Sequence, residues 1–336
     1  MRFLRRSITI ILGVAFCVAL FFSLYFYLKA LRYDTRETND PVKHRPKYHF
    51  VLVPEEMDNA YWHLVEKGAK DAGKALGAAV EYIGPAQADL ERHNDVIEEA
   101  IASKVDGIIT QGLNTDQMTP VINNAIQHGI PVITVDTDDP ESRRAAYIGT
   151  DNFQAGRLAG QKLAEATGGK ALVGIVTGSF ESESQKERVA GFKDVIKHYP
   201  GIKIVAIESS HITRIQAAEK TNKILIEHPD VNAFFGTSAL DGSGISAVAQ
   251  RYKKQGSLYI IGFDTLPETL KLLKEGWIDA TVSQEPYLMG YKSVQDLVSL
   301  INGKQVPEVE YTKTKVIEVA DLPANRNRQN GEVKAP

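Results

Sequence analysis

The sequence lacks several residue patterns that mark common functions. Its 336 residues contain a single cysteine, Cys17, which excludes an intrachain disulfide and a Cys/His zinc cluster. The net charge of −3 provides no electrostatic footprint for nucleic acid. The eight histidines do not cluster at metal-ligand spacing. We therefore expect no metal site, no cofactor and no nucleic-acid partner.

The signatures of common enzymes are missing as well. There is no GxSxG, HExxH or GxxxxGK[ST] pattern, and no GxGxxG pattern follows a predicted strand. The glycine- and serine-rich stretch GTSALDGSG (236–244) fits a strand-to-helix turn without a phosphate-binding motif. We expect a protein that is not an enzyme. Acid–base chemistry by carboxylates in a cleft is the lesser alternative.

A long apolar run is present near the N-terminus. Residues 8–28, ITIILGVAFCVALFFSLYFYL, carry no charge, and as a helix they would extend roughly 31 Å, about the hydrocarbon thickness of a bilayer. The run ends in bulky aromatic residues rather than in the small residues of a signal-peptide cleavage site. The sequence therefore favours an uncleaved, single-pass cell-membrane anchor within 1–32 over a cleaved signal peptide. We expect the rest of the chain to be extracytoplasmic.

The remaining chain reads as a linker, a folded region and a tail. Residues 33–47 are polar and contain two prolines, which is typical of a linker. From residue 48, apolar strand-like stretches alternate with stretches of helical spacing, which predicts an α/β fold with doubly wound parallel sheets. Because about 270 residues are too many for one such sheet, we predict two α/β lobes. The last residues, 321–336, form a polar tail.

Two of the predicted strands end in aspartate. The stretch GIPVITVDTDD runs into Asp136, Asp138 and Asp139, and the stretch SLYIIGFD ends in Asp264. Ligands of open α/β sheets bind beyond the carboxyl ends of the strands. Asp136 and Asp264 are therefore candidate ligand-binding residues, with tight turns as the alternative. We expect Asp138 and Asp139 to be solvated loop acids.

Six short motifs occur in a defined order along the chain. They are DNAYW (58–62), GIPVITVD (129–136), YIGTDN (147–152), ERVAGF (187–192), IIGFD (260–264) and ATVSQEP (280–286). Together they resemble the type I periplasmic sugar-binding proteins, the ribose-binding protein group, over about residues 48–305. LacI-type repressors share this core but carry an N-terminal helix-turn-helix, where this sequence has its apolar run.

The resemblance implies an architecture and a function. It implies two lobes joined by a hinge of three crossing strands: an N-terminal lobe of 48–150 and 285–311, and a C-terminal lobe of 151–284 and 312–320. It implies a small sugar or polyol bound between the lobes. The implied partner is an ABC importer permease or a membrane histidine kinase. A structural or adhesion ectodomain with a vestigial cleft is the alternative from another class.

The resemblance also assigns candidate ligand-binding residues. A sugar ring has apolar faces that stack on aromatic rings, and hydroxyls that charged and amide groups bind strongly. The residues that match the family's aromatic, acidic, basic and amide positions are Asn59, Tyr61, Trp62, Asp136, Arg188, Phe263, Asp264 and Gln284. Thr137, Ser238 and Ile212 stand where ribose binders have arginine, asparagine and an aromatic residue. Thr137 and Ser238 remain candidates, and the identity of the sugar stays open.

Each assignment has a structural alternative. Tyr61 and Trp62 could be core residues near a helix start. Arg188 could form a surface ion pair, and Gln284 could be a loop residue. Asp264 could cap the helix that follows it. The order of the six motifs argues against all of these alternatives holding together.

Overall fold

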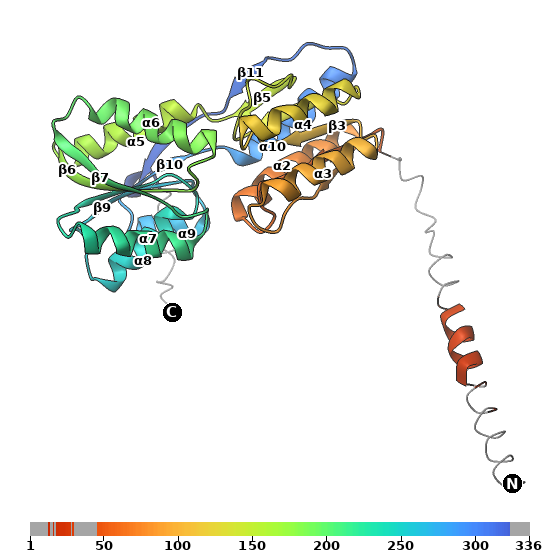
Figure 1. The fold of residues 1–336 in the computed structure, drawn as a ribbon, viewed down its shortest axis with the longest axis horizontal. Helices are drawn as coiled ribbons and strands as arrows, with labels where there is room; N and C mark the ends of the chain where they lie inside the picture. The colour runs from red at the N-terminus through yellow and green to blue at the C-terminus, as the bar shows by residue number, and fades with distance from the viewer. Residues whose placement is uncertain (1–12, 14–15, 17, 28, 30–45, 323–336) are drawn as a thin grey trace, which may run out of the picture. The chain divides into compact units, whose positions relative to one another are not determined.

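The computed structural model describes residues 13, 16, 18–27, 29 and 46–322 (Figure 1). The chain divides into two units, 1–45 and 46–336, and in the first of them residues 18–27 are helical. Much of the predicted membrane anchor, most of the linker and most of the tail lie outside the described residues. Among the residues that are described, no helix is long and apolar enough to span a membrane.

The first lobe is built on a six-stranded parallel sheet with the strand order β11-β5-β4-β3-β1-β2. Its strands are β1 (Tyr48–Leu52), β2 (Ala78–Tyr82), β3 (Gly107–Thr110), β4 (Val132–Val135), β5 (Ala146–Gly149) and β11 (Val309–Tyr311). Its helices are α2 (Ala60–Leu76), α3 (Leu90–Ala102), α4 (Thr115–Gln127) and α10 (Pro286–Ile301). The central strands β3, β4 and β5 are fully buried, as expected for a parallel sheet covered on both faces.

The second lobe repeats this design with the strand order β12-β10-β9-β8-β6-β7. Its strands are β6 (Lys170–Thr177), β7 (Gly201–Ser209), β8 (Ala233–Gly236), β9 (Tyr259–Phe263), β10 (Ala280–Ser283) and β12 (Lys315–Glu318). Strand β12 is antiparallel to β10, and the other pairs are parallel. The helices are α5 (Asn152–Ala166), α6 (Glu183–Ile196), α7 (Arg214–Glu227), α8 (Asp241–Arg251), α9 (Pro267–Lys274) and the 3₁₀ helix η1 (Val319–Asp321). The prediction of two α/β lobes is confirmed.

Alternating side chains of each strand pack under opposite helix layers. In β1, Phe50 and Leu52 belong to a core cluster with α2 and α10, whereas Val51 and the following Val53 belong to a cluster with α3 and α4. Each such side chain contributes roughly 1.5–3 kcal/mol when it is fully buried. Because both faces of the sheet are apolar, the strands read as continuous apolar stretches in the sequence.

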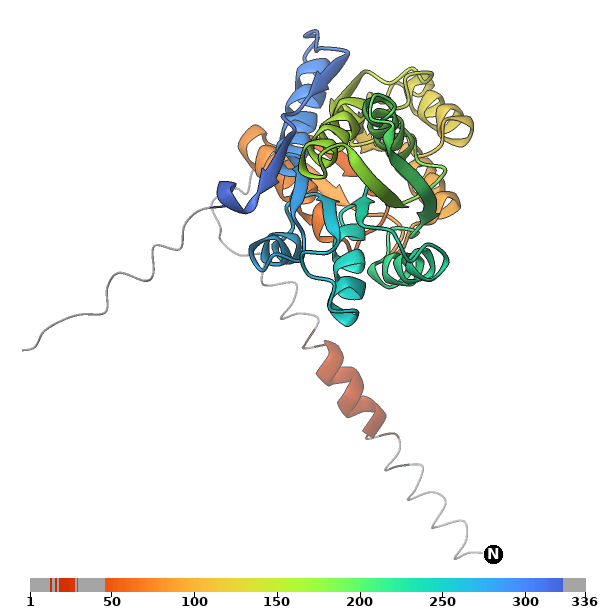
Figure 2. The same ribbon diagram turned by 90° about the vertical axis from the view of Figure 1, so that its left-hand side faces the viewer.

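The chain passes between the two sheets three times. The crossings lie between β5 and α5, between β10 and α10, and between β11 and β12. The blue C-terminal segment in Figures 1 and 2 makes the last of these passages. As a result, each lobe is assembled from separate stretches of chain, and the lobes share a hinge of three connections.

Two helix pairs, one in each lobe, approach until their backbones touch. A β-carbon at Gly68 of α2 would lie 1.9 Å from the carbonyl oxygen of Tyr287 in α10. In the second lobe, a β-carbon at Gly156 of α5 would lie 2.0 Å from the carbonyl oxygen of Arg188 in α6. Glycine is therefore required at both positions, and in the second lobe the contact involves the backbone of Arg188.

Replacing Gly156 with alanine is expected to lower the free energy of unfolding by about 1–3 kcal/mol, because the added methyl group must push α6 away from α5. The matched control is Gly160→Ala, one turn further along α5, where the nearest atom would lie 3.0 Å away and needs to move only slightly. Urea unfolding of both variants measures the difference. Equal stability of the two variants would contradict the backbone contact.

Candidate functional site

Two aspartates occupy equivalent strained positions at strand ends. Asp136 directly follows β4 and Asp264 directly follows β9, and their φ angles are 62° and 68°. This left-handed region costs a residue other than glycine roughly 1 kcal/mol or more, although aspartate tolerates it better than most. A turn alone would be served better by glycine. The repetition of the strain in both lobes indicates that the two carboxylates are needed where they lie.

The first-lobe carboxylate is held by two donors. The Tyr61 hydroxyl donates to Asp136 Oδ1 at 2.5 Å, and Gln111 Nε2 donates to Oδ2 at 3.1 Å. The neighbouring Thr137 hydroxyl donates across to Ser184 Oγ of the second lobe at 3.0 Å. Asp136 is 9% exposed, so these hydrogen bonds form largely without competition from water.

Arg188 brings a cation from the second lobe to this carboxylate. Its side chain is buried and donates to Asn152 Oδ1 at 2.8 Å, to the carbonyl oxygen of Thr237 at 2.8 Å and to Gln284 Oε1 at 3.1 Å. Its guanidinium group lies 3.9 Å from the ring centroid of Phe263 and 3.9 Å from Asp136 Oδ1. The stacking and the hydrogen bonds hold the guanidinium in one orientation.

The second lobe also contributes a carboxylate, which lies near Arg188 and Asp136. Asp264 is buried and accepts a hydrogen bond from Gln284 Nε2 at 2.8 Å. The pKa of Asp264 is raised to about 7, mainly by burial and also by the Asp136 charge, against the lowering effects of nearby Arg188 and of the Gln284 hydrogen bond. Asp264 is therefore poised between its charged and neutral forms near neutral pH.

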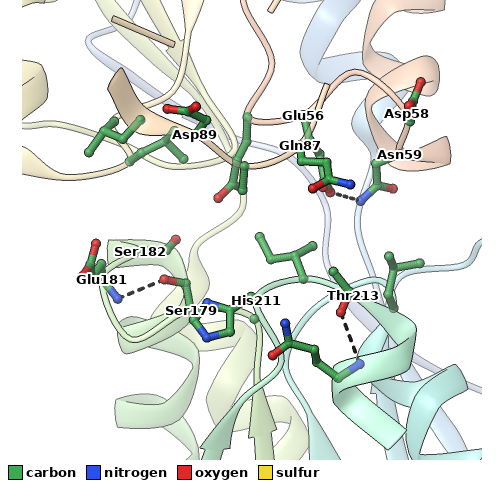
Figure 3. Close-up of a pocket in the computed structure, with 18 of the residues that line it drawn as sticks. Glu56, Asp58, Asn59, Gln87, Asp89, Ser179, Glu181, Ser182, His211 and Thr213 are labelled. Carbon is green, nitrogen blue, oxygen red and sulfur yellow. Dashed lines mark hydrogen bonds between the residues drawn. The ribbon is translucent and has the colours of Figure 1, made fainter. Parts of the chain in front are cut away.

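These side chains line one cavity between the lobes. All the candidate residues except Thr137 and Phe263 line its deep end, which has a volume of about 30 Å³, room for about two water molecules. An outer cleft of about 620 Å³ shares four lining residues with it: Glu55, Glu56, Asn59 and Ile212. In Figure 3, Glu56 and Asn59 of the first lobe lie across the cleft from Ser179, His211 and Thr213 of the second.

Two polar atoms near this cavity have no protein partner among the described residues. They are Ser238 Oγ, whose side chain lines the deep end, and Gln111 Oε1, whose amide nitrogen binds Asp136. Buried polar atoms are nearly always hydrogen-bonded, so an unpaired one points to a ligand or an ordered water. The site thus combines carboxylates, a guanidinium, amides, a hydroxyl and the rings of Tyr61 and Trp62.

Comparison with known proteins identifies the family. A family model described as "Periplasmic binding protein domain" matches residues 50–305. The chain belongs to the type I periplasmic sugar-binding protein family. Members of this family are binding proteins rather than enzymes, which agrees with the expectation that the chain is not an enzyme.

Several members resemble the chain over most of its length. The crystal structure of GanP, a glucose-galactose binding protein from Geobacillus stearothermophilus, is 58% identical, with a TM-score of 0.80, and the match covers 82% of this chain and 99% of GanP. XylFII in the XylFII–LytSN complex is 37% identical, with a TM-score of 0.79, and the match covers 82% and 99%. A D-ribose/D-allose-binding protein of Pseudomonas aeruginosa is 28% identical over 79% of this chain and 85% of its own length.

Several structural alternatives for individual residues of this binding protein can now be set aside. Arg188 is 2% exposed, so it forms no surface ion pair, and Gln284 is buried rather than in an open loop. Asp264 does not cap the next helix, because α9 has Leu266 at its N-cap and no side-chain cap bond. Tyr61 and Trp62 do belong to the core cluster of the first lobe, yet they also line the cavity.

The expectation that Asp138 and Asp139 are solvated acids was wrong for Asp139, whereas Asp138 is partly exposed. Asp139 is fully buried and accepts a hydrogen bond from the Thr119 hydroxyl at 2.7 Å. Asp138 forms an ion pair with Arg144, which is largely buried. The polar composition of this loop is typical of a solvated segment, but Thr119 of α4 and Arg144, which precedes β5, contact its acids.

Sequence reasoning missed residues that follow other strands or flank Arg188. Gln111 directly follows β3, Glu55 lies three residues after β1, and Gln185 precedes Arg188 by one helical turn. Glu55 and Gln185 line the deep cavity, and Gln111 holds Asp136. Polar residues at the carboxyl ends of the remaining strands were the available signal, since these ends all meet at the cleft. Within the described residues no group of three or more His, Cys, Asp or Glu side chains could hold a metal ion.

Two buried acids, one in the cavity and one beside it, should make the protein more stable at mildly acidic pH. The pKa of Asp264 is raised to about 7 and that of Asp241, also by burial, to about 6. Between about pH 4 and pH 7 the folded state therefore holds protons that the unfolded chain has released, so stability rises as pH falls through this window. Without sugar, the melting temperature should be higher at pH 6 than at pH 8.

The variant Asp264→Asn isolates the contribution of Asp264 to the pH dependence of stability. Asparagine tolerates the left-handed backbone and keeps an acceptor for Gln284, but it cannot ionise. It should be more stable than the unmodified protein at pH 8, by on the order of 1 kcal/mol or more, and this advantage should shrink at pH 6. An advantage that is the same at both pH values would exclude the raised pKa as its cause.

Proposed function

We propose that this protein is a receptor that binds a small sugar between its two lobes. The observation that supports this most is the convergence of Asp136 from the first lobe with Arg188 and Asp264 from the second in one cavity, beside the rings of Tyr61 and Trp62. Ionised groups bind sugar hydroxyls through strong hydrogen bonds, and aromatic rings cover the apolar faces of the sugar.

The sugar we favour is an aldohexose of the glucose or galactose type. Support comes from the 58% identity with GanP, which is described as a glucose-galactose binding protein. A hexopyranose offers more hydroxyls than a pentose to the polar groups of the cavity. Ribose and allose are the next candidates, because of the more distant Pseudomonas aeruginosa relative.

Binding requires the lobes to move. Room for about two water molecules does not admit a sugar ring, so the deep cavity must widen as the ligand enters from the outer cleft. The hydrogen bond from Thr137 to Ser184 and the contact between Arg188 and Asp136 join the lobes and must loosen. Because both lobes contribute to the site, the sugar then favours a closed form in which both contact it.

A thermal-shift screen of the full-length protein tests the proposal. Glucose, galactose, ribose, allose, arabinose, xylose and inositol are each added at millimolar concentration, and the melting temperature is recorded. A ligand at 100 times its Kd adds about 2.7 kcal/mol of stability, which is readily measured. If none of these sugars raises the melting temperature, the receptor proposal fails. The alternative, a structural or adhesion ectodomain with a vestigial cleft, is then favoured.

We further propose that the receptor is tethered outside the cytoplasm by residues 8–28 and acts with a membrane partner. The apolar length of that run supports tethering. The partner is either an ABC importer permease or a membrane histidine kinase; the existence of the XylFII–LytSN complex supports a role in which a family member works bound to a second protein. Membrane co-purification with and without sugar distinguishes the two partners, and recovery of neither would contradict this part of the proposal.

A further inference from the structure

The first lobe has a large groove at the end opposite the sugar site. This basal groove, of about 1090 Å³, is lined from the stretches 101–106, 126–131, 143–145 and 300–301. It opens where β3, β4 and β5 begin and where α3, α4 and α10 end. Asp106 before β3 lines the groove, whereas Gln111 after β3 holds Asp136, and five residues of strand extend roughly 17 Å. The basal groove shares no lining residue with the sugar cavity or its outer cleft.

The basal groove has an apolar floor and a positively charged rim. Buried and half-buried side chains form the floor: Ile101, Val105, Ile126, Ile130 and Leu300. The exposed ionisable side chains that line it are Lys104, Arg143, His128 and a single acid, Asp106. A surface of this kind fits a partner that is negatively charged at its surface and apolar beneath it.

The cations of the rim are free to meet such a partner. Neither Lys104 nor Arg143 forms an ion pair with another residue in the part of the chain that the structure describes. Asp106 is engaged elsewhere, since its Oδ2 accepts a hydrogen bond from the backbone N–H of His49 at 2.7 Å. Two more exposed lysines lie beside the groove in the chain, Lys47 before β1 and Lys304 after α10.

The chain enters the first lobe next to the basal groove. The Tyr48 hydroxyl, at the start of β1, donates to Asn302 Oδ1 at 3.3 Å, and Asn302 follows the lining residue Ile301. Only the 17 residues 29–45 separate this entry point from the apolar run 8–28, and a chain of that length spans at most roughly 60 Å. With the run 8–28 in a bilayer, this end of the lobe stays close to the lipid surface.

We propose that the basal groove and its four cations, Lys47, Lys104, Arg143 and Lys304, dock on anionic phospholipid headgroups of the membrane that holds the chain. This inference rests on the proposed tethering by residues 8–28 and not on the identity of the sugar. Headgroup phosphates pair with the cations, and the apolar floor covers the glycerol region of the lipid. Each cation near an anionic membrane surface changes the binding constant by about fivefold. Such weak contacts suffice because the tether raises the effective concentration of the lobe at the surface.

Docking gives the receptor one orientation on the membrane. The strands of the first sheet run from the basal groove to the sugar site, so a docked first lobe turns the cleft away from the bilayer. The first lobe is then held at the membrane, and closure on the sugar moves the second lobe. Because the two sites have no lining residue in common, sugar affinity should be the same in the docked and undocked states.

Hydrogen exchange of the full-length protein in lipid nanodiscs tests the docking. One set of discs contains phosphatidylcholine alone, and the other contains one-third phosphatidylglycerol. Backbone amides of 101–106 and 300–304 should exchange at least about fivefold more slowly in the anionic discs. Amides of the turn 253–257 in the second lobe should exchange equally in both. Raising the salt concentration from 0.05 M to 0.5 M should remove the difference, because salt screens the attraction.

Charge reversal separates docking from a stabilising role at helix ends. The double variant Lys104→Glu, Arg143→Glu should dock at least about 25-fold more weakly and lose its protection in anionic discs, with unchanged sugar affinity by isothermal titration. The matched control is Lys193→Glu, Lys274→Glu, which reverses two exposed cations in the last turns of α6 and α9 of the second lobe. The control should keep the full protection at 101–106.

The outcomes that would overturn the proposal are distinct. Equal exchange in the two kinds of disc, or protection that survives the double charge reversal, excludes docking on anionic lipid. Protection in native membranes but in neither kind of disc would assign the basal groove to a protein partner instead. A protein that does not stay with the discs refutes the tethering and this inference together, whereas the sugar titration decides the receptor proposal independently.

Discussion

Replacing Arg188 with methionine is expected to abolish measurable sugar binding and to lower the free energy of unfolding by about 3–5 kcal/mol at pH 8. The change removes three hydrogen bonds and the cation that faces Asp136, while methionine preserves most of the packing against Phe263. At pH 8 the buried carboxylates of Asp136 and Asp264 then keep their hydrogen bonds but lose the nearby cation. Affinity should fall by at least about 100-fold.

The pH dependence of this loss separates it from a packing defect. At pH 6 Asp264 can hold a proton, since its pKa is about 7, so the stability cost of Arg188→Met should be smaller than at pH 8. Arg157→Met is the matched control, because Arg157 pairs with Asp194 on the outer side of the same two helices and is partly exposed. That change should cost less than about 1 kcal/mol and leave sugar affinity intact. Sugar binding by Arg188→Met within threefold of the unmodified protein would refute the assigned role.

The second large effect is expected at Asp136, where alanine and asparagine should behave differently. Alanine in the left-handed conformation is strained, and it leaves the Tyr61 hydroxyl and the Gln111 amide without their acceptor. We expect a loss of about 2–4 kcal/mol of stability. Asparagine tolerates the backbone and keeps one acceptor oxygen. Gln111 can turn its unpaired Oε1 toward the new amide, so the stability of Asp136→Asn should change by less than about 1 kcal/mol.

Sugar affinity should fall in both Asp136 variants, because both remove the negative charge. A charge-assisted hydrogen bond to a sugar hydroxyl contributes roughly 1–3 kcal/mol, so Asp136→Asn should bind ten- to a hundredfold more weakly although it folds normally. Urea unfolding and isothermal titration of the two variants give the comparison. A well-folded Asp136→Asn protein with undiminished affinity would mean that this carboxylate serves the backbone turn and not the ligand.

Much of the site could be predicted because the ends of the strands are easy to recognise in the sequence, and because parallel strands all run in the same direction. The carboxyl ends of parallel strands meet at one edge of the sheet, so the sequence alone predicts that Asp136 and Asp264 lie at a cleft. The order of the six motifs added Arg188 and Gln284, which lie on a helix and in a crossing segment. The same argument from strand ends would have found Gln111, had it been applied to β3.

Other features depended on packing that no local pattern encodes. Phe263 stands next to an acid at a strand end, yet its ring is fully buried in the second-lobe core and stacks beneath Arg188. Asp139 sits in a polar loop but is enclosed by Thr119 and its neighbours. The strain at Ile212, a β-branched residue with φ of 52°, is likewise invisible in the sequence. In each case the outcome is set by side chains far away in the chain.

The position of β11 and β12 near the end of the described chain determines when each sheet can be completed during synthesis. β11 completes the first sheet and β12 completes the second, and both lie after residue 305. While the chain is being synthesised, the first sheet cannot reach its final strand order until Tyr311 has left the ribosome, and the second cannot until Glu318 has. A premature stop before residue 309 would therefore remove both strands and leave β5 and β10 as exposed edge strands, one in each lobe.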